Sequence, residues 1–354
     1  MLVLAMPYRT FARSALRAVL ASPEPLLRSM LGELPRNDRG HELDLGVGAF
    51  LRGVAAQRPK TSSRPLAHLR HEMDHRAPLA DFARCALHRV HERDVEIPGV
   101  GHSIPVRVYE PGPPTATPRP IVVYFHGGGF CIGSLRSHDG LCSRIARRAD
   151  CIVVAVEYRL APEHRFPAAV EDALAAFRWT AEHAHELGGD RHRVAVAGDS
   201  AGGNLAAVVA WHERGRDPRP CFQLLVYPVT DWAHDTESYR LFAEGFLHEA
   251  DAMMFFRENY LGGCAVSAAD PMASVLHAPC VRGAPRAHVV TAGFDPLRDE
   301  GERYARKLEA AGVHVDLQCE ESLVHGFFSL GGILHTSRRA IDRAIDALAR
   351  GMRA

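Results

Sequence analysis

The stretch Gly198-Asp199-Ser200-Ala201-Gly202 contains the residue types for nucleophilic chemistry. It follows the β-rich run VAVA and precedes the alanine-rich helical pattern NLAAVVAW. A serine on such a sharp strand-to-helix turn is presented at the strand end, where only small neighbours fit. The helix start behind it adds a partial positive charge that favours developing negative charge. The pattern predicts Ser200 as a nucleophile; a plain helix cap and a phosphate-binding turn are the alternatives.

A serine hydroxyl needs a base to take its proton and a third group to orient that base. Asp295 comes just after the buried run HVVTAGF, and His325 lies in a loop after the last β-rich run. Their spacing of 30 residues leaves room for one helix and one strand. Asp299 and Glu300 lie inside the following helix, so we expect them to point away from the strand ends. The order predicts a Ser200, Asp295, His325 triad, and a structural role for His325 is the alternative.

Three contiguous glycines occur in the motif HGGGF, residues 126–130, after another β-rich run. Glycines let backbone N–H groups approach a negative ligand, which is a phosphate in a nucleotide site or the oxyanion of a reaction intermediate. A dinucleotide loop would instead show G-x-G-x-x-G at the first strand-to-helix turn. With a triad downstream, the run predicts an oxyanion hole.

Five motifs in this order resemble the hormone-sensitive-lipase-like branch of the α/β-hydrolases. They are HGGGF (126–130), YRLAPEH (158–164), GDSAGGN (198–204), DPLRDEG (295–301) and HGF (325–327). The resemblance spans residues 90–350 and implies a serine carboxylesterase or lipase with an eight-stranded sheet and a helical cap. It implies Ser200 as nucleophile, His325 as base, Asp295 as its orienter, and the N–H groups of Gly127, Gly128 and Ala201 as oxyanion donors. Receptor members of the family have lost the histidine, which this chain retains.

The elements that must position these residues can be traced along the chain. From residue 92, short β-rich runs alternate with helical patterns, which predicts an α/β fold with a mostly parallel sheet flanked by helices. A short turn joins the first two strands, so we expect them to pair antiparallel at one edge. Residues 1–90 predict an N-terminal helical cap segment, and residues 91–354 predict the catalytic domain. An insertion at about 232–264 is expected to lie over the strand ends.

Apolar side chains near these motifs are candidates for a substrate pocket, with core packing as the alternative for each. The positive and negative side chains balance at 42 each, and the cap is rich in Phe, Met and Leu, which together favour an uncharged, mostly apolar substrate. We expect an ester with a short to medium acyl chain. An amidase, formamidase or lactonase with the same triad is one alternative, and a non-catalytic small-ligand receptor is another. The pocket candidates are Phe130, Phe246, Leu247 and Phe328.

Composition and spacing argue against several other functions. The balanced charge does not favour nucleic acid as a partner. The sequence HEMDH (71–75) matches the H-E-x-x-H zinc motif, but Pro65 and Pro78 bracket it, and we interpret it as a solvated helix. A zinc protease using His71 and His75 is kept as a rival hypothesis. The expected mechanism needs no cofactor and no metal.

Location and partners are less tightly constrained. The eight cysteines are scattered and form no CxxC pair, which predicts free thiols in the cytoplasm. Arg9, Arg13 and Arg17 predict an amphipathic N-terminal helix, either packed on the domain or weakly associated with a membrane surface. A homodimer is left open.

Overall fold

The computed structural model describes residues 23–353, except residues 56–59, 81–89, 114, 234 and 266. The predicted N-terminal basic helix and Cys85 therefore lie outside the described residues. The helices are α2 (Glu24–Leu31), α3 (Leu45–Ala55), α4 (Leu66–Ala80), α5 (Asp139–Ala149), α6 (Ala168–Glu182), α7 (Ala201–His212), α8 (Glu237–Leu241), α9 (Ala250–Leu261), α10 (Arg298–Ala310) and α11 (His335–Gly351). Short 3₁₀ turns occur at η1 (Thr61–Ser63), η3 (Val275–His277) and η4 (Phe327–Leu330).

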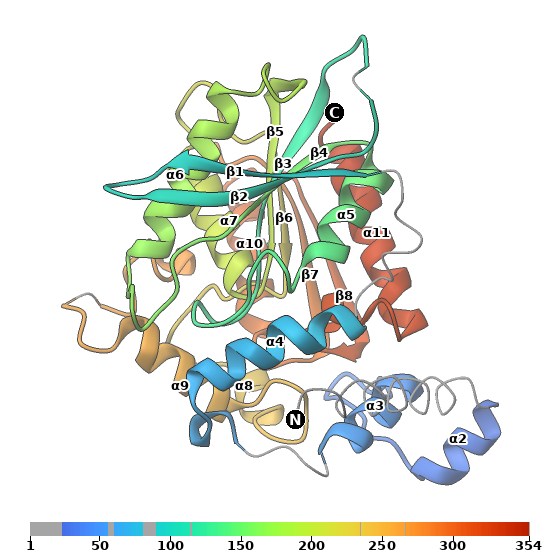
Figure 1. The fold of residues 1–354 in the computed structure, drawn as a ribbon. Helices are drawn as coiled ribbons and strands as arrows, with labels where there is room; N and C mark the ends of the chain where they lie inside the picture. Colours follow the sequence, from blue (N-terminus) through green and yellow to red (C-terminus); the bar gives the residue numbers. More distant parts are fainter. Residues whose placement is uncertain are drawn as a thin grey trace, which may run out of the picture.

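An eight-stranded sheet forms the centre of the molecule (Figure 1). Its strand order is β1-β2-β4-β3-β5-β6-β7-β8, in which β1 and β2 pair antiparallel and the strands from β4 to β8 are parallel. This confirms the predicted α/β-hydrolase sheet and the antiparallel edge. The strands are β1 (His91–Pro98), β2 (Ser103–Glu110), β3 (Arg119–Phe125), β4 (Ile152–Val156), β5 (Gly189–Asp199), β6 (Phe222–Val226), β7 (Arg286–Phe294) and β8 (Val315–Val324).

The central strands are apolar because both of their faces are covered. In β3, Ile121 and Val123 belong to one buried cluster, whereas Val122 and Tyr124 belong to the other, as the alternation of a strand requires. Helices α6, α7 and α10 contribute to the first cluster, and α5 and α11 contribute to the second. Figure 1 shows these two helical layers on either side of the sheet.

A separate group of helices lies beyond the carboxyl ends of the parallel strands. Figure 1 shows α4, α8 and α9 together at this end, with α2 and α3 beside them. The Ser62 hydroxyl, just before α4, donates a hydrogen bond of 2.6 Å to the Asp251 carboxylate of α9. The N-terminal segment and the insertion after β6 are therefore in contact. We call this group of helices the cap. In the described part of the chain, no helix combines the length and apolarity needed to cross a bilayer.

Candidate active site

Ser200 occupies a strained turn between β5 and α7. Its backbone angles are φ 55° and ψ −118°, a region that non-glycine residues rarely adopt. The turn is joined to the end of β6, because the Ser200 N–H donates to the Val226 carbonyl at 2.9 Å. A Cβ added to Gly198 would overlap the Gly202 carbonyl, and one added to Gly202 would overlap that of Phe125. The two glycines of the motif therefore allow the close backbone approach that the turn requires.

The three predicted triad side chains lie in one hydrogen-bonded line. His325 Nε2 is 3.0 Å from Ser200 Oγ, and His325 Nδ1 is 2.8 Å from Asp295 Oδ2. The other carboxylate oxygen of Asp295 accepts the Leu297 N–H at 2.8 Å. Asp295 has no exposed surface, while Ser200 and His325 retain 6% each. Strands β5, β7 and β8 end at one edge of the sheet, which is why residues so distant in sequence meet there.

The neighbouring acids Asp299 and Glu300 do not join this line. Asp299 Oδ2 accepts the Ser238 N–H at 2.9 Å, and Glu300 Oε1 accepts the N–H groups of Thr230 and Asp231 at 2.6 and 3.1 Å. Burial raises the pKa of Glu300 well above its ordinary value. The hydrogen bonds of both acids therefore go to the loop after β6 and to α8, and not to Ser200 or His325.

Two aromatic rings enclose the His325 imidazole. The centroid of the buried Tyr227 ring lies 4.4 Å from that of the His325 ring. The His248 ring stacks on the His325 ring, with 4.3 Å between centroids. His248 belongs to the segment between α8 and α9, so the cap reaches the triad directly. Sequence reasoning missed both residues, although His248 directly follows the nominated Leu247. A histidine beside a predicted pocket residue was the available signal.

The oxyanion prediction needs one correction, at Gly127. Its N–H donates to the buried carboxylate of Asp199 at 3.0 Å, so this donor is already satisfied. In the described part of this loop, the backbone–backbone hydrogen bonds are donated by Cys131 and Ile132, both to the Gly128 carbonyl. Gly128 and Gly129 both have positive φ, 130° and 60°, where glycine is favoured. Because the Gly127 N–H is used by Asp199, we expect the oxyanion donors of this loop to be Gly128 and Gly129.

Asp199, the variable residue of the G-x-S-x-G motif, joins the nucleophile turn to this loop. Its Oδ1 also accepts the Tyr124 hydroxyl at 2.7 Å and lies 3.4 Å from His138 Nε2. Burial alone raises the pKa of Asp199, but His138, Tyr124 and His126 outweigh it and hold that pKa below its ordinary value. The carboxylate stays ionised and fixes the loop beside Ser200.

The four pocket candidates divide into two pairs. Phe130 stacks on Tyr260 at 3.9 Å, and Phe328 lies edge-on to Tyr227, and neither ring has exposed surface. These two side chains form core beneath the site, which corrects the prediction that they contact substrate. Phe246 and Leu247 are partly buried, and Leu247 Cδ2 lies 3.4 Å from where a Cβ of Gly326 would stand. Leu247 thus borders the residue that follows His325, and the Phe246 ring lies 5.3 Å from that of Phe294, the residue before Asp295.

The H-E-x-x-H match lies on α4 and is satisfied by its neighbours. His71 and His75 share one face, with their rings stacked at 3.9 Å. Glu72 forms an ion pair with Arg64 and a second contact with His68 at 3.5 Å. Within the described ranges, no group of three or more His, Cys, Asp or Glu side chains is arranged to hold a metal ion. The arrangement gives the zinc-protease rival no support.

Comparisons with known proteins agree with this geometry. A family profile described as alpha/beta hydrolase fold matches residues 122–329. Carboxylic ester hydrolase LipN of Mycobacterium tuberculosis is 49% identical over 261 residues, covering 72% of this chain and 69% of LipN. Ethyl acetate hydrolase of Pseudomonas putida is 39% identical over 253 residues, covering 70% and 79% of the two chains. The crystal structure of EstE1, a carboxylesterase cloned from a metagenomic library, has a TM-score of 0.76 and 42% identity, covering 82% of this chain and 98% of EstE1. The chain belongs to the α/β-hydrolase fold family, in the hormone-sensitive-lipase-like branch that its motifs resemble.

Proposed function

We propose that this chain is a serine carboxylesterase that hydrolyses short- to medium-chain acyl esters through an acyl-enzyme intermediate. The observation that carries the proposal is the continuous line from Ser200 Oγ through the His325 imidazole to the Asp295 carboxylate. Nucleophile, base and orienting acid are within hydrogen-bond reach of one another, which is the geometric requirement for an activated serine.

The protonation state of His325 follows from its partners. Asp295 is an acceptor, so it favours the tautomer with the proton on Nδ1 and leaves the Nε2 lone pair facing Ser200. Ser200 then attacks the ester carbonyl while His325 takes its proton. His325 next protonates the leaving alcohol, and water repeats the sequence on the acyl-enzyme.

The oxyanion formed in each step carries its charge on the former carbonyl oxygen. We assign its stabilisation to the N–H groups of Gly128, Gly129 and Ala201, with Gly127 fixing the loop through Asp199. Each such donor is worth about 3 kcal/mol of barrier. The strained Ser200 turn supports this role because the first helical N–H, that of Ala201, follows it immediately.

The substrate class is inferred from the cap and from the relatives. Leu247 lies beside Gly326, and Phe246 packs on Phe294 just before Asp295, and this apolar surface suits an uncharged acyl chain. Two relatives are named for carboxylic esters and for ethyl acetate. We infer that this chain takes small esters of the same kind and acts in the cytoplasm, as its scattered cysteines suggest. A homodimer and weak membrane association of the N-terminal segment stay predictions.

The test is Ser200→Ala assayed on p-nitrophenyl esters of increasing acyl length, with p-nitroanilides and lactones as rival substrates. We expect wild type to prefer short to medium esters and Ser200→Ala to lose roughly 10⁶-fold in kcat. Ser103→Ala, an exposed serine at the start of β2, is the control and should retain activity. Unchanged ester hydrolysis by Ser200→Ala would refute the mechanism, and faster turnover of amides or lactones would redirect the substrate class.

A further inference from the structure

A small hairpin, residues 36–42, lies between cap helices α2 and α3. It contacts strands β7 and β8, which end just before Asp295 and His325. It is closed by an antiparallel bridge between Arg36 and Glu42, and the Asn37 N–H donates to the His41 carbonyl at 2.9 Å. The Asn37 side-chain oxygen accepts the N–H groups of Arg39 and His41 at 3.1 and 2.9 Å. These bonds hold the Asn37 side chain in one orientation, with its amide nitrogen directed at the sheet.

The amide nitrogen of Asn37 bridges β7 and β8 where their pairing is interrupted. The regular register stops at Ala292 and resumes at Phe294, so β8 bulges opposite Gly293. Asn37 Nδ2 donates to the Glu321 carbonyl at 3.1 Å and lies 3.5 Å from that of Gly293. Gly293 and Glu321 both lie in this gap of the β7–β8 register. Bulges beside active sites re-aim side chains, and this one comes four residues before His325 and two before Asp295.

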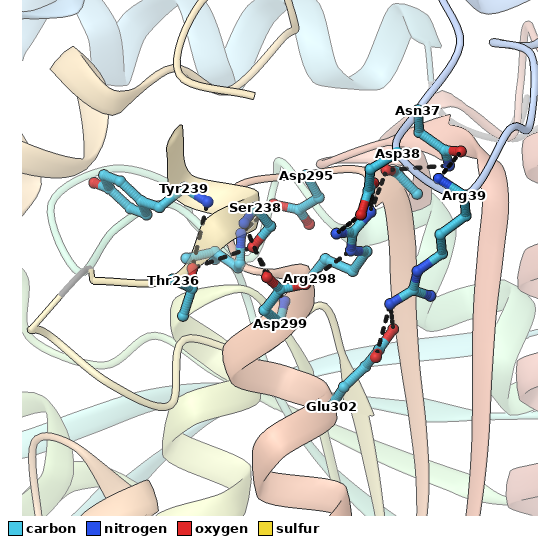
Figure 2. A network of polar contacts seen from close by, with 12 residues as sticks. Asn37, Asp38, Arg39, Thr236, Ser238, Tyr239, Asp295, Arg298, Asp299 and Glu302 are labelled. Carbon is cyan, nitrogen blue, oxygen red and sulfur yellow. Dashed lines mark hydrogen bonds and ion pairs between the residues drawn. The ribbon is translucent and has the colours of Figure 1, made fainter. Parts of the chain in front are cut away.

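A buried arginine extends the contact to the turn that holds Asp295. Arg298 is 2% exposed, and its guanidinium binds both oxygens of Asp38 at 2.6 and 2.9 Å (Figure 2). The same group reaches the Gly293 carbonyl at 3.3 Å. Arg298 begins α10, and its N–H donates to the Asp295 carbonyl at 3.1 Å. The hairpin therefore contacts the Gly293 carbonyl, two residues before Asp295, and the side chain of Arg298, three residues after it.

Helix α8 holds the same turn from the other side. The Ser238 hydroxyl donates to the Pro296 carbonyl at 2.7 Å, and the Ser238 N–H donates to Asp299 at 2.9 Å. Asp299 in turn accepts from the Arg298 Nε at 2.9 Å. Figure 2 shows Asp295 between these two groups of contacts, with the hairpin on one side and α8 on the other.

We propose that Asn37 and Asp38 are positioning residues for the reaction. Through the β8 bulge and Arg298, they set the distance and angle between Asp295 and His325, so that an ordered cap is a condition for a competent triad. The proposal rests on the proposed esterase function. Its physical basis is that a shift of about 1 Å in a catalytic group costs up to 10²-fold in rate, even when the altered residue is far from the chemistry.

Kinetics of Asn37→Ala and Asp38→Asn test the proposal. Each variant should lose about 10-fold in kcat for a p-nitrophenyl ester while KM stays within about twofold. Asn37 contacts backbone near the triad directly, and Asp38 does so through the Arg298 guanidinium, so neither side chain contacts the substrate in this proposal. Arg36→Ala is the matched control, since this arginine lies in the same hairpin, is 60% exposed and bonds to Glu42 and Gly40. It should keep wild-type kcat.

A double-mutant cycle separates positioning from a general loss of fold. In an Asp295→Asn background, Asn37→Ala should cost less than twofold more, because the group it positions is already disabled. Full additivity, or unchanged kcat in both folded single variants, would overturn the proposal. If Asn37→Ala fails to fold, Asp38→Asn decides. If wild type and Ser200→Ala are equally active, the esterase assignment fails instead, so the two failures are distinguishable.

Discussion

Replacing Asp295 by asparagine tests how the triad acid works in this site. Both carboxylate oxygens accept N–H groups at 2.8 Å, one from His325 Nδ1 and one from the Leu297 backbone. An amide offers one acceptor in place of two. If its NH₂ faces Leu297, a buried N–H loses its partner at a cost of about 1–3 kcal/mol. If its NH₂ faces His325, Nδ1 must be unprotonated, and the proton on Nε2 then points at Ser200.

The second orientation leaves Ser200 without a base, and both orientations remove the negative charge that stabilises the imidazolium. We therefore expect Asp295→Asn to lower kcat about 10⁴-fold, as for the wrong tautomer in a serine triad. That loss corresponds to about 5 kcal/mol of transition-state stabilisation. The assay is hydrolysis of a short p-nitrophenyl ester under saturating substrate, with denaturant unfolding to establish that the variant is folded.

Asp150→Asn is the control for an acid-to-amide change. Asp150 is 64% exposed, and it has the left-handed backbone that asparagine tolerates. It should keep wild-type activity. A kcat for folded Asp295→Asn within tenfold of wild type would refute the argument, because it would mean that His325 finds the productive tautomer without the carboxylate.

Two further predictions concern the groups around the triad. His248→Ala removes the ring stacked at 4.3 Å on His325 and should lower kcat about 2- to 10-fold, since such a pair is worth about 0.5–1.5 kcal/mol. His248→Phe should recover most of that loss, and equal losses in both variants would contradict a stacking role. The pKa of Asp199 is lowered from 3.8, so its ionised form stabilises the fold above the unfolded pKa and that contribution is lost as pH falls through the folded value. Denaturant unfolding should show wild type losing more stability below about pH 4 than Asp199→Asn does; identical pH slopes would show that this carboxylate does not contribute.

The sheet and the triad were predictable from the sequence because their signals are local. A buried strand must be apolar on both faces, and the nucleophile turn needs small residues at Gly198 and Gly202. Asp295 and His325 each follow a strand, and parallel strands end at a common edge. These rules need no knowledge of how distant side chains pack.

The remaining parts of the site depend on contacts between residues that are distant in the chain. Such contacts produce no recognisable motif or residue spacing in the sequence. Gly127 was predicted as an oxyanion donor, yet its N–H is taken by Asp199, a residue whose motif position is variable. Phe130 has the composition of a pocket residue, but Tyr260 of α9 covers its ring. His248 reaches His325 only because the cap folds over the strand ends. The domain boundary at residue 90 and the limits of the cap insertion, residues 232–264, stay predictions.

The carboxylate of Asp199 links the nucleophile turn to the glycine loop by hydrogen bonds. It sits next to Ser200 in the chain and binds Gly127 and Tyr124 of the loop and its preceding strand. For protein engineering, this means that the two segments are not separable modules. A glycine loop grafted from a relative must arrive with the acid at position 199 and its tyrosine partner, or the transplanted backbone will lack the anchor that sets its distance from the serine.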